Sequence, residues 1–221
     1  MQGFISMLMI VMLTLTATAK ARKLYPVDEG AKDASFKAFR NKLIEAVKER
    51  NTPFILTILH PKIHLSFGGH SGVKDFLEMW KPDSPDSALW KELSTILSLG
   101  GTFSTSDGKR NFWAPYTFST FPNDLDAYEY APIVGANVRV RSQPNTTARI
   151  VTILSYDIVK ATFLFHDNNR EDDIPNWVKV IVPDGRNGYV ASRYVRSAID
   201  YRLGFERIRG QWLITAFIGG D

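Results

Sequence analysis

The sequence predicts an α+β protein: helices packed on a curved antiparallel sheet, with a small β-barrel inserted before the final hairpin. Three observations support this class. In the first hundred or so residues of the 221-residue chain, apolar side chains recur at helical spacing. From about residue 102 onward they alternate between the two faces, as in strands. The last part of the chain has the pattern of an apolar hairpin, which must join a sheet because a lone hairpin is marginally stable in water.

Helices are expected at intervals through residues 34–97. The first opens near Ala34, where apolar residues fall on one helical face: Phe36, Phe39, Leu43, Ile44 and Val47. The second, Thr52–Leu59, starts with a threonine cap and carries a proline in its first turn. Two further helices are expected at Val73–Trp80 and Ser87–Leu97, with a short strand at Ile63–Phe67.

Strands follow after residue 102, where aromatic and β-branched residues become common. Thr102–Ser106, Asn111–Phe118 and Asp126–Ile133 are expected to form the curved sheet. The final hairpin, Tyr201–Ile208 and Gln211–Ile218, is expected to return to this sheet. On this interpretation, residues 20–133 and 198–221 make up one α+β domain. Residues 134–197 are then a second domain inserted at a surface hairpin.

The composition limits the chemistry available to this chain. Hydrophobic residues make up 44% of the sequence and five tryptophans are present, which is enough for a packed core. Cysteine is absent, which excludes disulfides, thiolate catalysis and cysteine-ligated zinc. The formal net charge of +4 comes from 27 basic and 23 acidic residues, a balance that does not indicate nucleic-acid binding. We therefore expect no nucleic-acid partner, no cofactor and no metal site.

Residues 1–19 have the character of an export signal, which is removed from a mature protein. Phe4 to Leu15 is an almost unbroken apolar run, and Ala17-Thr18-Ala19 fits the small-x-small pattern of a cleavage site. The run is about twelve residues long, whereas a membrane-spanning helix needs about twenty. We therefore expect a periplasmic or secreted chain with no stable membrane span after cleavage near Lys20. A buried N-terminal helix is the alternative.

Residues 134–197 carry the most specific pattern in the chain. Asn137–Pro144 is a short alternating strand that runs into a turn, and Asp184–Val195 repeats this arrangement about fifty residues later. Ile150–Asp157 and Trp177–Val180 lie between them. These four stretches, in this order, resemble the opening strand, the "xVxxLxxGD" strand, the "WxKV" strand and the closing strand of the bacterial SH3-like family.

This resemblance implies a small closed β-barrel that binds extended ligands and is not catalytic. The ligands of the family include cell-wall peptides and glycans, so we expect the partner to be a cell-wall peptide or glycan, or an envelope protein. The implied groove lies between the first long loop and the closing turn, where aromatic stacking and hydrogen bonds hold the ligand. The expected contact residues are Tyr156, Tyr189, Tyr194 and Arg141.

The chain departs from the family pattern in several places. Gln143 and Tyr156 stand where the family has glycines, and Tyr189 stands where it has a tryptophan. His166–Asp173 is an acidic insertion in place of a short turn. It lacks the spacing of a calcium loop, so we interpret it as a solvated charged loop.

The flanking residues resemble, more loosely, the cone-shaped α+β domains of nuclear-transport-factor-like proteins. Leu56–Trp80 and the terminal strand pair Phe205–Asp221 carry this resemblance. Because that fold hosts enzymes, binders and immunity proteins, it does not determine a function. It leaves an alternative open: a small-molecule-binding or hydrolytic enzyme with a pocket in the α+β domain. His64 and His70, near Asp75, are the candidate acid–base residues of that pocket.

Overall fold

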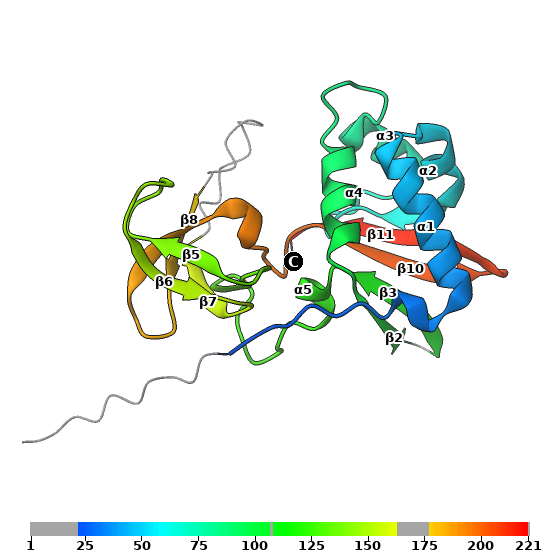
Figure 1. The fold of residues 1–221 in the computed structure, drawn as a ribbon. Coiled ribbons are helices and arrows are strands. Elements are labelled where there is room, and N and C mark those ends of the chain that lie inside the picture. Colours follow the sequence, from blue (N-terminus) through cyan, green and yellow to red (C-terminus); the bar gives the residue numbers. More distant parts are fainter. Residues whose placement is uncertain (1–21, 107, 163–176, 221) are drawn as a thin grey trace, which may run out of the picture.

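The computed structural model describes residues 22–106, 108–162 and 177–220. They form two sheets, one of which carries a layer of helices (Figure 1), so the predicted α+β class is confirmed. The expected export signal, residues 1–19, lies outside the described residues. So does the acidic insertion, His166–Asp173.

The first sheet and its helices come from both ends of the chain. The helices are η1 (Gly30–Lys32), α1 (Ala34–Lys48), α2 (Thr52–Ile58), α3 (Gly72–Trp80), α4 (Leu89–Ser98) and α5 (Tyr116–Ser119). The strands are β1 (Leu59–His64), β2 (Thr102–Ser106), β3 (Lys109–Ala114), β10 (Arg202–Ile208) and β11 (Gln211–Ile218).

The second sheet comes from the middle of the chain. Its strands are β4 (Tyr130–Pro132), β5 (Val138–Arg141), β6 (Ile150–Leu154), β7 (Ile158–Thr162), β8 (Trp177–Ile181) and β9 (Asn187–Ala191). A short 3-10 helix, η2 (Ser192–Tyr194), follows β9 and leads back toward the first sheet.

The first sheet has five strands in the order β1-β11-β10-β3-β2. The terminal hairpin lies inside this sheet: β10 pairs with β3, from Leu203 opposite Ala114 to Glu206 opposite Asn111. The chain therefore leaves the first sheet after β2 and β3 and returns to it at β10. This is the return that the apolar pattern of the hairpin predicts.

The expectation of an antiparallel sheet is wrong at one edge, because β1 runs parallel to β11. The strand also begins earlier than the predicted Ile63–Phe67, at Leu59. Pro61 lies within it, which is tolerated because an edge strand leaves one row of backbone groups without a partner strand. Leu59 and Ile63 are both buried and point into the core.

The predicted strand Asn111–Phe118 ends early, at Ala114. Pro115 follows, and proline has no N–H to donate to a sheet ladder. The next residues form the short helix α5, in which Tyr116 is fully buried. The aromatic alternation of this stretch therefore does not continue along one strand, and the prediction is wrong for its second half.

The predicted strand Asp126–Ile133 is also shorter than expected and belongs to the other sheet. The Tyr128 amide donates to the Asp126 side chain and the Tyr130 amide donates to the Asp126 carbonyl, which makes a turn. Only Tyr130–Pro132 is a strand, and it pairs with β7. The second sheet thus takes up residues that the sequence pattern assigns to the first.

The second sheet has six strands in the order β4-β7-β8-β9-β5-β6, and all neighbouring pairs are antiparallel. No pairing among the described residues joins β4 to β6, so these pairings do not close the expected barrel. The sheet has its own core of inward-facing residues, chiefly valines. The two sheets therefore have separate cores. In the second sheet, the residues that alternate with its buried side chains form its outer face.

The apolar faces of α1 to α4 pack on one face of the first sheet and form the larger core (Figure 1). Phe36 of α1 is fully buried at its centre. Its ring centroid lies 4.3 Å from that of Phe112, 4.9 Å from that of Trp212 and 5.5 Å from that of Phe205. Burial of one such side chain stabilises a protein by about 1.5–3 kcal/mol, so this aromatic cluster anchors α1 on the sheet.

Residues 22–29, which we call the arm, join the two sheets; in Figure 1 the arm is the dark-blue segment between them. Lys23 Nζ lies 3.0 Å from the Oδ2 atom of Asp157, a buried residue just before β7. Leu24 is buried in a small cluster with Tyr116 of α5 and Ile158 of β7. The arm is therefore packed against the second sheet at its first residues.

The far end of the arm is attached to the first sheet and its helices. Asp28 Oδ1 lies 2.5 Å from Arg40 Nη1 of α1, and the Glu29 amide donates to the Gly101 carbonyl at 2.8 Å. Burial acts to raise the pKa of the Asp28 carboxyl, but hydrogen bonds from Arg40 and from the Gly30 amide outweigh it and lower the pKa. The carboxylate is thus held ionised, which keeps the arm fixed to α1.

Candidate binding face

The outer face of the second sheet follows from the alternation of its strands. Val138 and Val140 of β5 are buried, as are Val178 and Val180 of β8 and Val190 of β9. Since successive side chains of a strand point to opposite faces, the residues between these valines point outward. They include Arg139 and Arg141 on β5, Lys179 on β8 and Tyr189 on β9.

Three of the outward residues lie side by side across three strands. Arg141 is directly opposite Tyr189, and Tyr189 is directly opposite Lys179. Residues directly opposite in antiparallel strands have Cβ atoms about 5 Å apart and share one face. We call these three residues the cationic row; Lys179 is exposed, and the other two are half-buried. Tyr189 thus has a basic residue opposite it on each neighbouring strand.

Glycine is required where β9 approaches β5. A Cβ atom added at Gly188 would lie 2.4 Å from Val140 Cγ1 and 3.0 Å from the Arg141 carbonyl oxygen. No real side chain is accommodated at such distances without a shift of the neighbouring strand. Gly188 therefore permits the close approach that places Tyr189 opposite Arg141.

The loop after β5 positions the guanidinium of Arg141. Its Nη1 atom donates to the Ala148 carbonyl at 2.7 Å. The loop is in turn braced by Asn145, whose Oδ1 accepts hydrogen bonds from the amides of Thr147 and Ala148. The hydrogen bond to Ala148 occupies one edge of the guanidinium. Arg141 forms no ion pair with a described residue.

The described residues of this part of the chain are rich in basic side chains. Residues 134–162 and 177–197 contain eight lysines and arginines but only two acidic residues. Both carboxylates are already paired, Asp157 with Lys23 and Asp184 with Arg186. Neither cation of the row has an acidic partner among the described residues. The face is therefore suited to an anionic ligand.

The four predicted contact residues fall into two pairs. Arg141 and Tyr189 are neighbours in the row, whereas Tyr156 and Tyr194 both lie beside Gly135. The Tyr156 amide donates to the Gly135 carbonyl at 3.0 Å, and the Tyr194 ring packs beside the same glycine. That all four line one groove stays a prediction.

Tyr156 is instead engaged with the arm. Its carbonyl accepts a hydrogen bond from the Leu24 amide at 2.8 Å, and its ring centroid lies 5.6 Å from that of Tyr25. Its φ angle is +61°, a left-handed conformation in which glycine is the usual residue. A left-handed backbone explains why the family has a glycine at this position, and Tyr156 adopts the same kind of conformation. Tyr156 contributes to the attachment of the arm.

Lys179 is the residue of the row that the sequence interpretation missed. Its outward direction follows from the alternation of Trp177-Val178-Lys179-Val180, so that signal was present. Its position beside Tyr189 depends on the register between β8 and β9, which no local pattern provides.

His64 and His70 lie at an exposed turn next to α3. A β-bridge joins His64 to Ser71, and His70 Nδ1 lies 3.5 Å from Asp75 Oδ2. Both histidines are exposed. Because solvent surrounds these side chains, nothing in this geometry favours the enzyme alternative. Among the described residues, no group of three histidine or acidic side chains is arranged to hold a metal.

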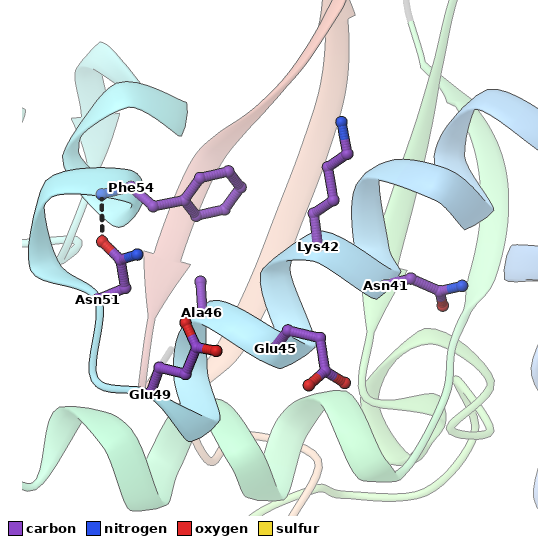
Figure 2. Close-up of a pocket in the computed structure, with 7 residues that line it drawn as sticks. All are labelled: Asn41, Lys42, Glu45, Ala46, Glu49, Asn51 and Phe54. Atoms are coloured by element: carbon purple, nitrogen blue, oxygen red, sulfur yellow. Dashed lines mark hydrogen bonds between the residues drawn. The ribbon is translucent and has the colours of Figure 1, made fainter.

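Two cavities lie on the first sheet and its helices, and neither histidine lines them. One, of about 390 Å³, lies between α1 and α2 (Figure 2). Its lining comprises Asn41, Lys42, Glu45, Ala46, Glu49, Asn51 and Phe54. The other, of about 550 Å³, lies near the tip of the terminal hairpin and is lined by His60, Lys109, Arg110, Glu206, Arg207 and Ile208. Neither lining joins a nucleophile to a base.

Comparison with known protein families gives a match for the part of the chain that holds β5 to β9. Residues 136–196 match the family model described as the bacterial SH3 domain. Comparison of the chain with curated proteins and with solved structures gives no match. The likeness of the flanking residues to nuclear-transport-factor-like domains stays a prediction. Through the part of the chain that the structure describes, no helix has the length and apolar character needed to cross a bilayer. The family match identifies residues 136–196, from before β5 through η2, as a bacterial SH3 domain.

Proposed function

We propose that this chain is an exported, non-catalytic binding protein whose SH3 domain contacts cell-envelope material, namely the peptide part of peptidoglycan. The observation that carries the proposal is the cationic row on the outer face of a bacterial SH3 domain. Arg141, Tyr189 and Lys179 offer charge, a hydrogen-bonding hydroxyl and an aromatic ring on adjacent strands. These are the groups that hold an extended polar ligand. An envelope protein is the second candidate partner.

Retention on purified peptidoglycan tests the proposed function. The full chain is incubated with peptidoglycan sacculi, and the bound fraction is measured after sedimentation. We expect wild type to be retained and Tyr189→Ala to be retained less, because the ring at the centre of the row is lost. Tyr128→Ala is the matched control, since Tyr128 is 49% exposed and lies outside the SH3 domain. Failure of the wild type to sediment with the sacculi would count against peptidoglycan as the partner.

Export is part of the same proposal and rests on the apolar run from Phe4 to Leu15. Fractionation of a bacterial host that expresses the full chain tests it. The wild type is expected in the periplasm or the medium, with a chain shortened by about twenty residues because the signal is removed. Leu13→Arg, which interrupts the run, is expected to leave the chain in the cytoplasm. An unshortened cytoplasmic wild type would contradict export.

A further inference from the structure

We propose that the cationic row is a carboxylate-binding site and that its ligand is a free carboxylate of a peptidoglycan peptide. This inference rests on the proposed function and makes it more specific. It assigns roles to three side chains: the Arg141 guanidinium and the Lys179 ammonium bind the carboxylate oxygens, and the Tyr189 hydroxyl donates between them. It also adds Lys179 to the contact residues expected from the sequence.

The side-chain chemistry of the row favours a carboxylate. A guanidinium presents a planar set of N–H donors that matches two carboxylate oxygens, and an ammonium adds a compact charge. Hydrogen bonds between ionised partners are about twice as strong as neutral ones. The hydrogen bond from Arg141 Nη1 to the Ala148 carbonyl fixes one edge of the guanidinium. Because the group is held in place before binding, less side-chain entropy is lost when a ligand arrives.

The surroundings of the row favour an anion over a neutral glycan. Arg139 is the next outward residue on β5 and is exposed. The residues directly opposite the two ends of the row are neutral: Ile150, opposite Arg141, and Thr162, opposite Lys179. Arg141 and Lys179 stand on the strands on either side of Tyr189, so an anion placed over the tyrosine is attracted by both cations.

The apolar neighbour of the row favours a peptide as the carrier of the carboxylate. Ile150 is 41% exposed, and Ile153, opposite Arg139, is 55% exposed. A short peptide with an aliphatic side chain next to a free carboxylate matches this arrangement, because it buries the isoleucine side chains while its charge lies over the row. A bare phosphate polymer offers charge but no aliphatic group.

Chemical blocking of the carboxylates tests the assignment. Peptidoglycan is first stripped of phosphate-bearing polymers. Half of it is then amidated, so that peptide carboxylates become neutral amides, and binding of the full chain to both preparations is measured over a range of concentrations. We expect wild type to bind the untreated material about tenfold or more tightly, the effect of losing one charge-assisted contact. Binding of the untreated material is also expected to weaken as salt rises.

Arg141→Gln/Lys179→Gln supplies the protein side of the experiment. The double variant keeps polar side chains but removes both charges, and we expect it to bind untreated material about tenfold or more weakly than wild type. Lys42→Gln/Lys62→Gln removes the same formal charge from exposed positions outside the SH3 domain and is expected to bind like wild type. Unchanged urea midpoints establish that both variants fold.

The outcomes separate this inference from the proposed function. Tight binding that neither amidation nor the Arg141/Lys179 change affects would overturn the carboxylate assignment and leave the binding function intact. Binding only to material that keeps its phosphate polymers would also overturn it, in favour of phosphate. Absence of binding to every preparation would overturn both proposals.

Discussion

At the scale of single residues, Asp33 shows how one side chain starts a helix. Its Oδ1 atom accepts hydrogen bonds from the amides of Ser35 at 2.9 Å and Phe36 at 3.0 Å, which have no partner within α1. A hydrogen bond from the Ser35 hydroxyl and one from the Phe36 amide lower the pKa of the Asp33 carboxyl below its ordinary value and outweigh the effect of burial. The folded state therefore favours the ionised form of the Asp33 carboxyl.

Asp33→Ala is expected to lower the free energy of unfolding at pH 7 by about 1 kcal/mol, the usual effect of losing such a cap. Because the folded-state pKa is lowered, the ionic part of this stabilisation is present above the unfolded-state value of about 4 and is lost as pH falls through the folded-state pKa. Urea unfolding at pH 7 and at pH 3 measures both effects. Asp33→Asn, which keeps the cap oxygen, is the control, and a difference between wild type and Asp33→Ala that grows on acidification would refute the argument.

Gly188→Ala tests the close approach of β9 to β5. The new methyl group has no room beside Val140, so the strands must separate, and we expect the free energy of unfolding to fall by about 1–3 kcal/mol. Gly68→Ala is the matched control, because the nearest atom to a Cβ there is 3.7 Å away and Gly68 does not have a positive φ. Equal urea midpoints for the two variants would show that the approach is not tight.

At the scale of elements, the sequence predicted the helices and strands that are indicated by the spacing of apolar residues within a short stretch of chain. The periodic apolar faces of α1 and α4 and the alternation of β5, β10 and β11 are all observed. Strand partners could not be predicted in this way: the parallel pairing of β1 with β11 joins residues about 150 positions apart. The same limit applies to the site, because the position of Lys179 beside Tyr189 depends on pairing between strands.

The arm is an element without periodicity, which is why its sequence indicated only an irregular segment. Its attachment comes from single contacts with distant residues, such as Lys23 with Asp157 and Asp28 with Arg40. The role of such a segment can be seen only in a structure that positions both partners of each contact. The sequence of the arm alone therefore does not indicate how much it contributes to the stability of the fold.

Leu24→Ala tests the contribution of the arm. Leu24 is 7% exposed and packs with Tyr116 and Ile158, so truncation leaves a cavity where α5 meets β7. We expect the free energy of unfolding to fall by about 2–3 kcal/mol, measured by urea denaturation. Leu77→Ala, at a position that is 37% exposed on α3, is expected to change it by less than about 1 kcal/mol. Similar losses for both variants would mean that the arm is not a packed element.

At the scale of the whole molecule, Arg196 connects the SH3 domain to the first sheet. Its Nη2 atom donates to Glu92 Oε1 of α4 at 2.7 Å and to the Tyr201 carbonyl at 2.6 Å. The Arg196 side chain is 11% exposed and that of Glu92 is 23% exposed, so this ion pair is largely shielded from water. Together with the arm, it ties the second sheet to the helical layer of the first.

Arg196→Ala is expected to uncouple the two parts of the molecule. Removing the guanidinium leaves Glu92 and the Tyr201 carbonyl without this donor, so the free energy of unfolding falls by about 2 kcal/mol. Tryptophan fluorescence, which reports mainly on the first sheet and its helices, and far-ultraviolet circular dichroism are followed together in urea. Their transitions are expected to coincide in wild type and in Arg149→Ala, an exposed control, and to separate in Arg196→Ala. Coincident transitions in Arg196→Ala would contradict the coupling.

The central claim is that the outer face of the SH3 domain binds a carboxylate of the cell-wall peptide. The most direct measurement is a nuclear magnetic resonance titration of the ¹⁵N-labelled full chain with soluble peptidoglycan fragments whose peptides have free carboxylates. We expect the largest amide shifts on β5, β8 and β9, centred on Arg141, Tyr189 and Lys179. The absence of shifts, or shifts confined to α1, α2 or the turn that carries His64 and His70, would contradict the claim.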